Sequence, residues 1–301
     1  MVKRVLVGYG VDVDAVSGWL NTRDGSPANP TEVSRGIFGA TVGIDRLLKL
    51  WDKHNVKTTW FVPGHSLESF PKQLAKVRDA GHEIALHGYT HEFVSTLNAQ
   101  QQRDVLTRSI DTMTAFLGKK PKGWTAPAWS TSRETVSLLE EFGIEYDHSF
   151  MHHDGQLYYL PDGSENYTST DVSKDASAWM SPMSALKPSK VVCVPANWHL
   201  DDWPPFVLSL KQPSTHGYVD TYSVEQCWKD IFTFMYQEYD QFVFPMSIHP
   251  QVSGKPQVML MHERLIKWIN EHGGVEWCTM ETMVKEFKEG RLQGAVVEGG
   301  V

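Results

Sequence analysis

The sequence has few cysteines, no long apolar run and no cluster of basic residues. Only three cysteines occur among 301 residues (Cys193, Cys227 and Cys278), and their odd number and irregular spacing argue against a disulfide framework. No stretch approaches the ~20 apolar residues of a transmembrane helix. The net charge is −8 and no Lys/Arg run occurs, which makes nucleic acid an unfavourable partner. We therefore expect neither a membrane nor a nucleic-acid partner, and a neutral or weakly charged substrate.

The N-terminal segment MVKRVLVGYGVDVDA also lacks the features of an export signal. Its apolar run is too short, and no small-residue cleavage site follows it. A buried β-strand that opens the fold explains this pattern better. Cys193 lies in the apolar run VVCVP, which is typical of a buried free thiol in a reducing compartment. We therefore expect a cytoplasmic protein.

What the chain does have is a persistent alternation of strand and helix patterns, which predicts a parallel α/β sheet. The alternation alone leaves open whether the sheet is doubly wound or closed into a barrel. Residues 1–290 are expected to form one domain with a long polar insertion over 151–189, and 291–301 a C-terminal tail. The expected strands cover 4–14, 56–62, 82–88, 121–127, 144–150, 190–198, 241–250 and 275–280, and the expected helices cover 42–55, 67–81, 98–118, 131–143, 223–240, 256–274 and 281–290.

Candidate catalytic residues follow three of these strands, at the carboxyl edge where α/β proteins carry their chemistry. Asp12 and Asp14 are two apart and point to the same face of a strand. His87 and His91 flank a turn in HGYTH, and His249 lies in MSIHP at the end of a later strand. Two histidines and one aspartate suit a divalent metal such as zinc, and iron, cobalt or nickel also fit. The second aspartate is then free to act as a base.

Each of these signals has a simpler explanation when it is taken alone. A chain with 13 histidines produces a pair four residues apart by chance, and Asp-x-Asp also forms turns. His148, His152 and His153 could form a second site, although a solvated polar loop explains them more simply. Only the shared location at strand ends favours a functional site.

The motifs VDVD, HGYTH, APAW and SIHP, in this order, resemble those of the NodB-homology polysaccharide deacetylases, carbohydrate esterase family 4. The resemblance extends over nearly the whole chain. It is strongest to a subgroup that holds Helicobacter-type peptidoglycan deacetylases, cyclic imidases and, more distantly, allantoinases. It implies a distorted (β/α) barrel of parallel strands and, in its assembly, a tetramer.

The resemblance also implies the roles of the site residues. Asp14, His87 and His91 correspond to metal ligands, with zinc or cobalt as the usual ion. Asp12 corresponds to the catalytic base, and His249 to the acid that protonates the leaving nitrogen. A backbone N–H near Ala128 is expected to hold the oxyanion. The expected substrate-binding residues are Trp19, Pro127, Ala128, Trp129, Trp198, Asp201 and Asp202.

The third motif departs from the family pattern. The broader family has Arg-x-Pro-aromatic, whereas this chain has Thr125-Ala126-Pro127-Ala128. The subgroup usually has Ala-Pro-Trp-Trp-Glu, whereas this chain has Ala126-Pro127-Ala128-Trp129-Ser130, so one tryptophan and the carboxylate are missing. The substrate therefore stays open between two enzymatic hypotheses. The first is N-deacetylation of an amino-sugar polymer such as peptidoglycan or chitin. The second is ring-opening of a small cyclic amide or imide. A non-catalytic metal- or carbohydrate-binding protein is a third alternative.

Overall fold

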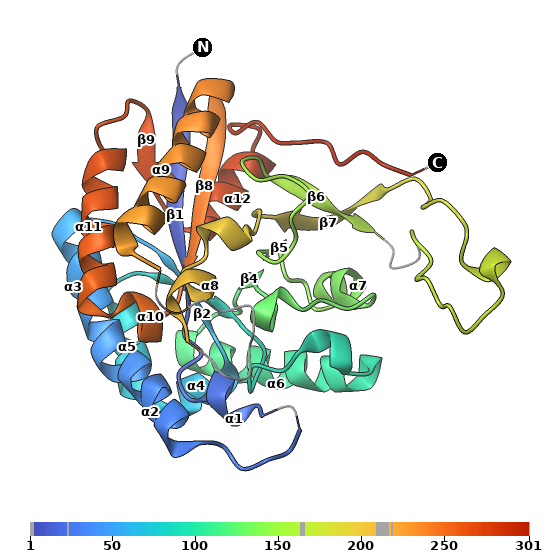
Figure 1. The fold of residues 1–301 in the computed structure, drawn as a ribbon, viewed down its shortest axis with the longest axis horizontal. Coiled ribbons are helices and arrows are strands. Elements are labelled where there is room, and N and C mark those ends of the chain that lie inside the picture. The colour runs from blue at the N-terminus through green and yellow to red at the C-terminus, as the bar shows by residue number, and fades with distance from the viewer. Residues whose placement is uncertain (1–2, 23, 163–165, 209–216, 218, 301) are drawn as a thin grey trace.

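A computed structural model describes residues 3–22, 24–162, 166–208, 217 and 219–300. Within them, one curled and mostly parallel sheet has the strand order β6-β7-β5-β4-β3-β2-β1-β8, and β9 also pairs with β1 (Figure 1). The strands are β1 (Arg4–Asp12), β2 (Thr59–Val62), β3 (Glu83–Leu86), β4 (Gly123–Trp124), β5 (Tyr146–Asp147), β6 (Tyr158–Asp162), β7 (Lys187–Cys193), β8 (Gln241–Ile248) and β9 (Val275–Trp277).

Helices cover the outside of the curled sheet, so this is the distorted barrel that the resemblance implies (Figure 1). None of the helices in the described part of the chain is long and apolar enough to cross a membrane. The α-helices are α1 (Ser17–Leu20), α2 (Pro30–Phe38), α3 (Ile44–His54), α4 (Gly64–Ser69), α5 (Pro71–Asp79), α6 (Ala99–Leu117), α7 (Thr135–Glu141), α8 (Trp203–Phe206), α9 (Thr221–Glu238), α10 (Pro250–Ser253), α11 (Pro256–Ile269) and α12 (Met280–Lys288).

The two faces of β1 serve different cores. Val5, Val7 and Tyr9 join the large core between the sheet and the outer helices, whereas Leu6 joins a smaller core inside the curl. Gly8 follows on this inner face, where a β-carbon would lie 2.8 Å from the Met283 side chain of α12. Helix α12 therefore fills the amino end of the barrel.

Two backbone contacts help to close the sheet on its open side. Asp201 forms a parallel bridge with Ser247 of β8, and the Val243 N–H of β8 donates to the Gly155 carbonyl at 2.8 Å. The segments that follow β5 and β7 thereby reach the free edge of β8. This closure brings residues 201–202 beside the end of β8, where His249 lies.

The helical segment before β2 starts earlier than the sequence predicts. Helix begins at Pro30, capped by the Asn29 side chain, and continues through a wide π-turn at Gly39–Gly43 into α3. The predicted start at residue 42 is wrong because the apolar spacing that indicated the helix covers only its second half. The glycines of the π-turn are needed for close packing: a β-carbon at Gly43 would lie 2.3 Å from the Pro250 carbonyl oxygen.

The insertion and the tail contact each other at their ends. β6 within the insertion pairs antiparallel with β7, and the tail's Ala295 N–H donates to the Leu157 carbonyl at 2.8 Å. The sequence predicted less regular structure over 151–189, and much of that segment is indeed without helix or strand. The division at residue 290 remains a prediction.

Candidate metal centre and catalytic site

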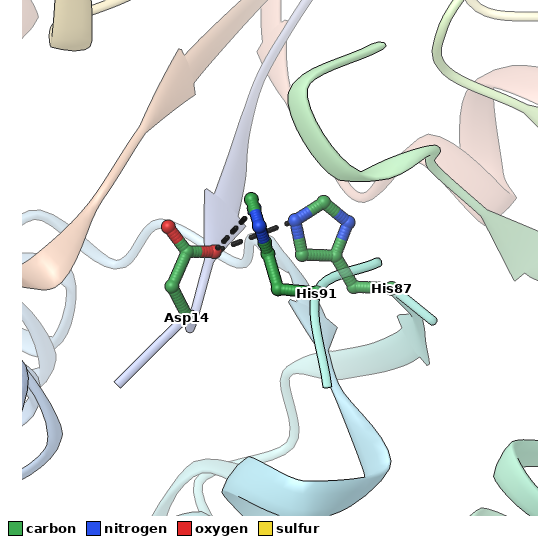
Figure 2. A group of neighbouring side chains, drawn as sticks. All are labelled: Asp14, His87 and His91. Atoms are coloured by element: carbon green, nitrogen blue, oxygen red, sulfur yellow. Dashed lines mark ion pairs between the residues drawn. The ribbon is translucent and has the colours of Figure 1, made fainter. Parts of the chain in front are cut away.

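The predicted site residues lie together at the carboxyl edge of the sheet. Asp12 is the last residue of β1, His87 directly follows β3, and His249 directly follows β8. Figure 2 shows the side chains of Asp14, His87 and His91 converging from two neighbouring chain segments. Their proximity is the direct consequence of parallel strands that end at one edge.

The geometry of this trio suits a metal ion. The Asp14 Oδ1 atom lies 3.4 Å from His87 Nε2 and 3.5 Å from His91 Nε2. One ligand atom from each residue lies within 4.8 Å of the others. In the described part of the chain, Asp14 Oδ1 and His87 Nε2 are buried without a hydrogen-bond partner. Two buried polar atoms of this kind need a partner, and a divalent cation satisfies a carboxylate and two imidazoles together.

The proton positions of the trio bear on this fit. The His87 Nδ1 atom lies 2.9 Å from the Thr125 carbonyl oxygen, which can only accept, so Nδ1 donates a proton and Nε2 is the atom that faces Asp14. Burial lowers the pKa of His87, but Asp12 and Asp14 outweigh burial and raise it, so a metal ion would have to displace a proton from Nε2. Burial lowers the pKa of His91 to about 4, which keeps it neutral. Burial raises the pKa of Asp14, but the facing imidazoles outweigh burial and leave it well below its usual value. Neutral imidazoles and an ionised carboxylate are the forms that bind metals.

Glu92 holds the turn between the two histidines. Its Oε2 accepts from the Tyr89 N–H at 3.0 Å, and its Oε1 accepts from the Thr90 N–H at 2.8 Å. His91 itself has a φ of 60°, in the left-handed region that non-glycine residues rarely adopt. The Glu92 carboxylate therefore stabilises a strained turn that points both imidazoles at Asp14. No role could be assigned to Glu92 from the sequence alone.

We predict that Glu92→Ala weakens metal binding about 10- to 100-fold, the usual cost of losing a group that orients metal ligands. Competition with a chromophoric chelator measures the dissociation constant. Glu68→Ala is the matched control, since Glu68 accepts from the Tyr89 hydroxyl at 2.6 Å on the surface and does not contact the turn backbone. Equal affinities for Glu92→Ala and the unmodified protein would contradict the assignment.

Asp12 and His249 lie close to each other and to the trio. Asp12 Oδ2 lies 3.8 Å from His87 Nε2 and 3.9 Å from His249 Nε2. Burial raises the pKa of Asp12, which makes its carboxylate a stronger base than an exposed aspartate. Burial lowers the pKa of His249, but Asp202 outweighs burial and raises it well above its usual value. One group is thus suited to accept a proton and the other to donate one.

Asp201 and Asp202 are expected on the substrate side of the site, but the structure places both against protein. Asp202 is completely buried behind His249, and its Oδ1 accepts from His249 Nδ1 at 2.7 Å. Asp201 Oδ1 accepts from the Trp203 N–H at 2.7 Å, at the start of α8. Asp202 therefore orients the imidazole, and Asp201 organises the adjoining loop.

Aromatic side chains flank the site in two pairs. Trp19 lies 5.7 Å from Trp203, centroid to centroid, and Trp203 lies 4.9 Å from the His249 ring. On the other side Trp129 lies 4.4 Å from Trp198, whose side chain is 46% exposed. The Trp198 ring is thus available to a ligand, while the inner tryptophans pack against protein groups.

Backbone strain is concentrated at the same place. Of the five non-glycine residues with positive φ in the described chain, four adjoin the site: Ala15, His91, Ala128 and Trp129. Strain of this kind persists where the surrounding structure enforces it, and it clusters at functional sites. Pro127–Trp129 forms a short 3₁₀ segment in which Ala128 has a non-helical φ of 51°. The oxyanion role of an N–H near Ala128 remains a prediction.

The remaining histidines of interest are structural. His82 directly precedes β3, at the end of the strand opposite to the site, and its Nδ1 accepts from the Thr58 N–H at 3.1 Å. His148 is buried rather than in a solvated loop: its Nδ1 donates to the Val194 carbonyl at 2.8 Å. Two groups in the described chain could hold a metal ion, Asp14 with His87 and His91, and His249 with Asp201 and Asp202. Neither group includes His148, His152 or His153.

We predict that His148 makes the fold acid-sensitive. Burial lowers its pKa from 6.5 to about 4, so the unfolded chain binds a proton between these values that the folded chain does not. The stability that neutral His148 contributes above pH 6.5 is therefore lost as the pH falls toward 4. Urea unfolding at pH 7 and pH 4.5, on protein stripped of metal by a chelator, measures this loss of stability. The difference in free energy of unfolding between the unmodified protein and His148→Asn should be smaller at pH 4.5 than at pH 7 by about 2–3 kcal/mol. A difference that does not change with pH would contradict the prediction.

A parallel barrel, a His₂Asp metal-binding group at its carboxyl edge, a buried carboxylate and an imidazole held by a second carboxylate together define a class of protein. It is the class of metal-dependent hydrolases in which water attacks a carbonyl carbon. Comparison with known proteins identifies the family within this class.

Residues 38–146 match the family profile named Polysaccharide deacetylase. The peptidoglycan deacetylase of Helicobacter pylori is 45% identical over 287 residues, covering 95% of this chain and 97% of that protein. The peptidoglycan deacetylase-like protein FGM2 of Gibberella zeae is 40% identical over an alignment that covers 95% of this chain and 87% of that protein. The crystal structure of a proposed polysaccharide deacetylase from Mycobacterium smegmatis superimposes with a TM-score of 0.80 at 27% identity, covering 98% and 94%.

The chain belongs to the polysaccharide deacetylase family. Members of this family are hydrolases of amide carbon–nitrogen bonds and depend on a divalent metal, so the predicted fold, reaction class and metal requirement are confirmed.

Proposed function

We propose that this protein removes N-acetyl groups from an amino-sugar polymer of the peptidoglycan type. The observation that carries the proposal is the convergence of Asp12, Asp14, His87, His91 and His249 at one edge of the barrel. The two relatives that are 45% and 40% identical, and whose names specify peptidoglycan, support the substrate class. Nearly the full length of this chain takes part in both alignments.

We assign Asp14, His87 and His91 as metal ligands, with zinc as the ion that best suits two imidazoles and a carboxylate. These three residues would hold a divalent cation, which would supply polarisation of the amide carbonyl and a lower pKa for the attacking water. Asp12 accepts the proton of that water as it attacks the acetyl carbon. The Ala128 N–H donates to the oxygen that becomes negative.

His249 completes the reaction by protonating the leaving nitrogen. Its Nε2 atom faces the two carboxylates of Asp12 and Asp14 at 3.9 Å each, while Asp202 holds Nδ1. The acetyl group leaves as acetate, and the sugar nitrogen leaves as an amine. Pro127 and the tryptophans 19, 129 and 198 are proposed to contact the substrate, with the exposed Trp198 ring stacking on a sugar face.

A direct comparison of substrates tests the proposal. Zinc-loaded protein is incubated in parallel with peptidoglycan, with chitohexaose, and with the small rings succinimide and hydantoin. We expect acetate release from the polymers and no ring-opening. Ring-opening without acetate release would replace the proposed substrate by a cyclic amide or imide. A lack of both reactions in protein that holds its metal would favour a binding protein and overturn the proposal.

A further inference from the structure

The carboxylate that holds His249 is itself held by a chain of buried side chains that reaches the far side of β1. Asp202 Oδ2 accepts from Ser253 Oγ at 2.5 Å, and Ser253 Oγ lies 2.8 Å from His262 Nε2. His262 Nδ1 lies 3.2 Å from the Tyr9 hydroxyl. Tyr9, Asp202, Ser253 and His262 have no exposed surface, and His249 is 7% exposed. The chain joins β1, α10 and α11 to the residue proposed to be the acid.

The hydrogen-bond directions along this chain follow from its chemistry. An ionised carboxylate can only accept, so Ser253 must donate its single proton to Asp202. The Ser253 oxygen then accepts from His262 Nε2–H. Burial lowers the pKa of His262 to about 3, so the ring is neutral and its Nδ1 accepts from the Tyr9 hydroxyl. Every donor between Tyr9 and Asp202 therefore points toward the carboxylate.

Such an aligned chain has a specific effect on the site. Each hydrogen bond polarises the next, so the donors together stabilise negative charge on Asp202. The Asp202 Oδ1 atom is thereby kept as an acceptor for His249 Nδ1–H. This fixes the tautomer and the ring orientation of His249, and it leaves Nε2 as the atom that faces Asp12.

We propose that Ser253 and His262 are positioning residues for the acid step, acting on His249 through Asp202. This inference rests on the proposed function, since it concerns the protonation of the leaving nitrogen. Tyr9 ends the chain and acts more weakly because it is farthest from Asp202. The motif that carries Ser253 and His262, SGKPQVMLMH, is thus part of the site although neither side chain touches substrate.

Leaving-group chemistry separates this role from a merely structural one. Release of an amine from an amide requires protonation, whereas the p-nitrophenolate of p-nitrophenyl acetate leaves without it. In zinc-loaded protein, Ser253→Ala should lower kcat for chitohexaose about 10- to 100-fold with KM nearly unchanged, given the strength of hydrogen bonds to charged groups. Hydrolysis of p-nitrophenyl acetate should change less than about twofold.

The expected loss of amide kcat decreases along the hydrogen-bonded side chains with distance from Asp202. His262→Leu should lower the amide kcat less than Ser253→Ala, and Tyr9→Phe least of all. His262→Gln should recover most of the loss, because the glutamine amide can occupy the place of Nε2–H and donate to Ser253. His82→Gln is the matched control: a buried histidine at the opposite end of the sheet, whose replacement should leave both substrates unaffected. If Ser253→Ala does not fold, Ser253→Cys, with its weaker donor, takes its place in the comparison.

A second readout does not depend on the enzymatic reaction. The His249 Nδ1 proton shared with Asp202 should give a proton resonance far downfield of the backbone amides in histidine-labelled protein. Ser253→Ala and His262→Leu should shift or broaden this resonance, while His82→Gln should not. If these variants shift the resonance although the unmodified protein releases no acetate, the proposed function is overturned but the effect of the hydrogen-bonded side chains on His249 is supported.

Two results would overturn the inference itself. In active unmodified protein, equal losses on amide and ester in Ser253→Ala would show a general structural defect. An unchanged amide kcat together with an unchanged resonance in both Ser253→Ala and His262→Leu would show that the chain does not act on His249.

Discussion

Asp12→Asn is expected to lower kcat for amide hydrolysis about 100- to 10,000-fold, the usual contribution of a general base. The amide retains the shape of the carboxylate, but its basicity is gone. Metal binding should persist, because the three assigned ligands are Asp14, His87 and His91. Acetate release from chitohexaose and metal content by atomic absorption are measured on the same preparation, so that the two effects are separated.

Two outcomes of that experiment would contradict the assignment of Asp12. Near-normal turnover with metal bound would show that another group accepts the proton. Loss of the metal together with the activity would show that Asp12 is a ligand. This outcome is tested because Asp12 Oδ2 lies 3.8 Å from His87 Nε2, one of the assigned ligand atoms.

His87→Ala should reduce acetate release to the level of chelated protein and should remove stoichiometric metal binding. Its Nε2 atom is one of three ligand atoms, and two remaining ligands do not provide a closed set for zinc. The buried methyl of alanine also leaves Asp14 Oδ1 without its neighbouring imidazole at 3.4 Å. The loss should therefore appear in both metal content and turnover.

His82→Ala is the matched control for His87→Ala, because it removes a buried imidazole from the other end of the same strand. We expect it to lower thermal stability while metal content and acetate release per folded molecule stay unchanged. Retention of metal and of activity by His87→Ala would contradict the metal site as assigned.

The strand-end residues could be predicted because local patterns determine where they point. Alternation along β1 places Leu6, Gly8 and Gly10 inside the barrel, and Asp12 continues the same face. Parallel strands then bring His87 and His249 to the same edge. The roles of these residues were assigned from the motifs, which resemble those of the family in the same order. The convergence of these side chains could therefore be predicted from the sequence, and their roles as metal ligands remain a prediction.

The residues that support the site could not be predicted in the same way. Ser253 meets Asp202 across 51 residues of sequence, and His262 meets Tyr9 across 253. These contacts depend on how α10 and α11 pack against the barrel, which no local pattern specifies. Glu92 was visible beside HGYTH, but its contacts with two backbone N–H groups depend on the conformation of the turn.

The π-turn at Gly39–Gly43 shows the same limit in the fold. Its glycines look like helix breakers in the sequence, yet they are required because the Pro250 backbone packs against the helix. A contact between segments more than 200 residues apart decided the local structure. The apolar spacing that indicated the helix covers only its second half, so its start was misplaced.

Titration of chelator-stripped protein with zinc, with acetate release from chitohexaose followed at each addition, tests the central claim most directly. The account predicts that turnover rises in proportion to bound zinc and saturates at one ion per chain, and that neither occurs in His87→Ala. Full turnover by the metal-free protein, or saturation with one zinc ion and no acetate release from any amino-sugar polymer, would contradict it.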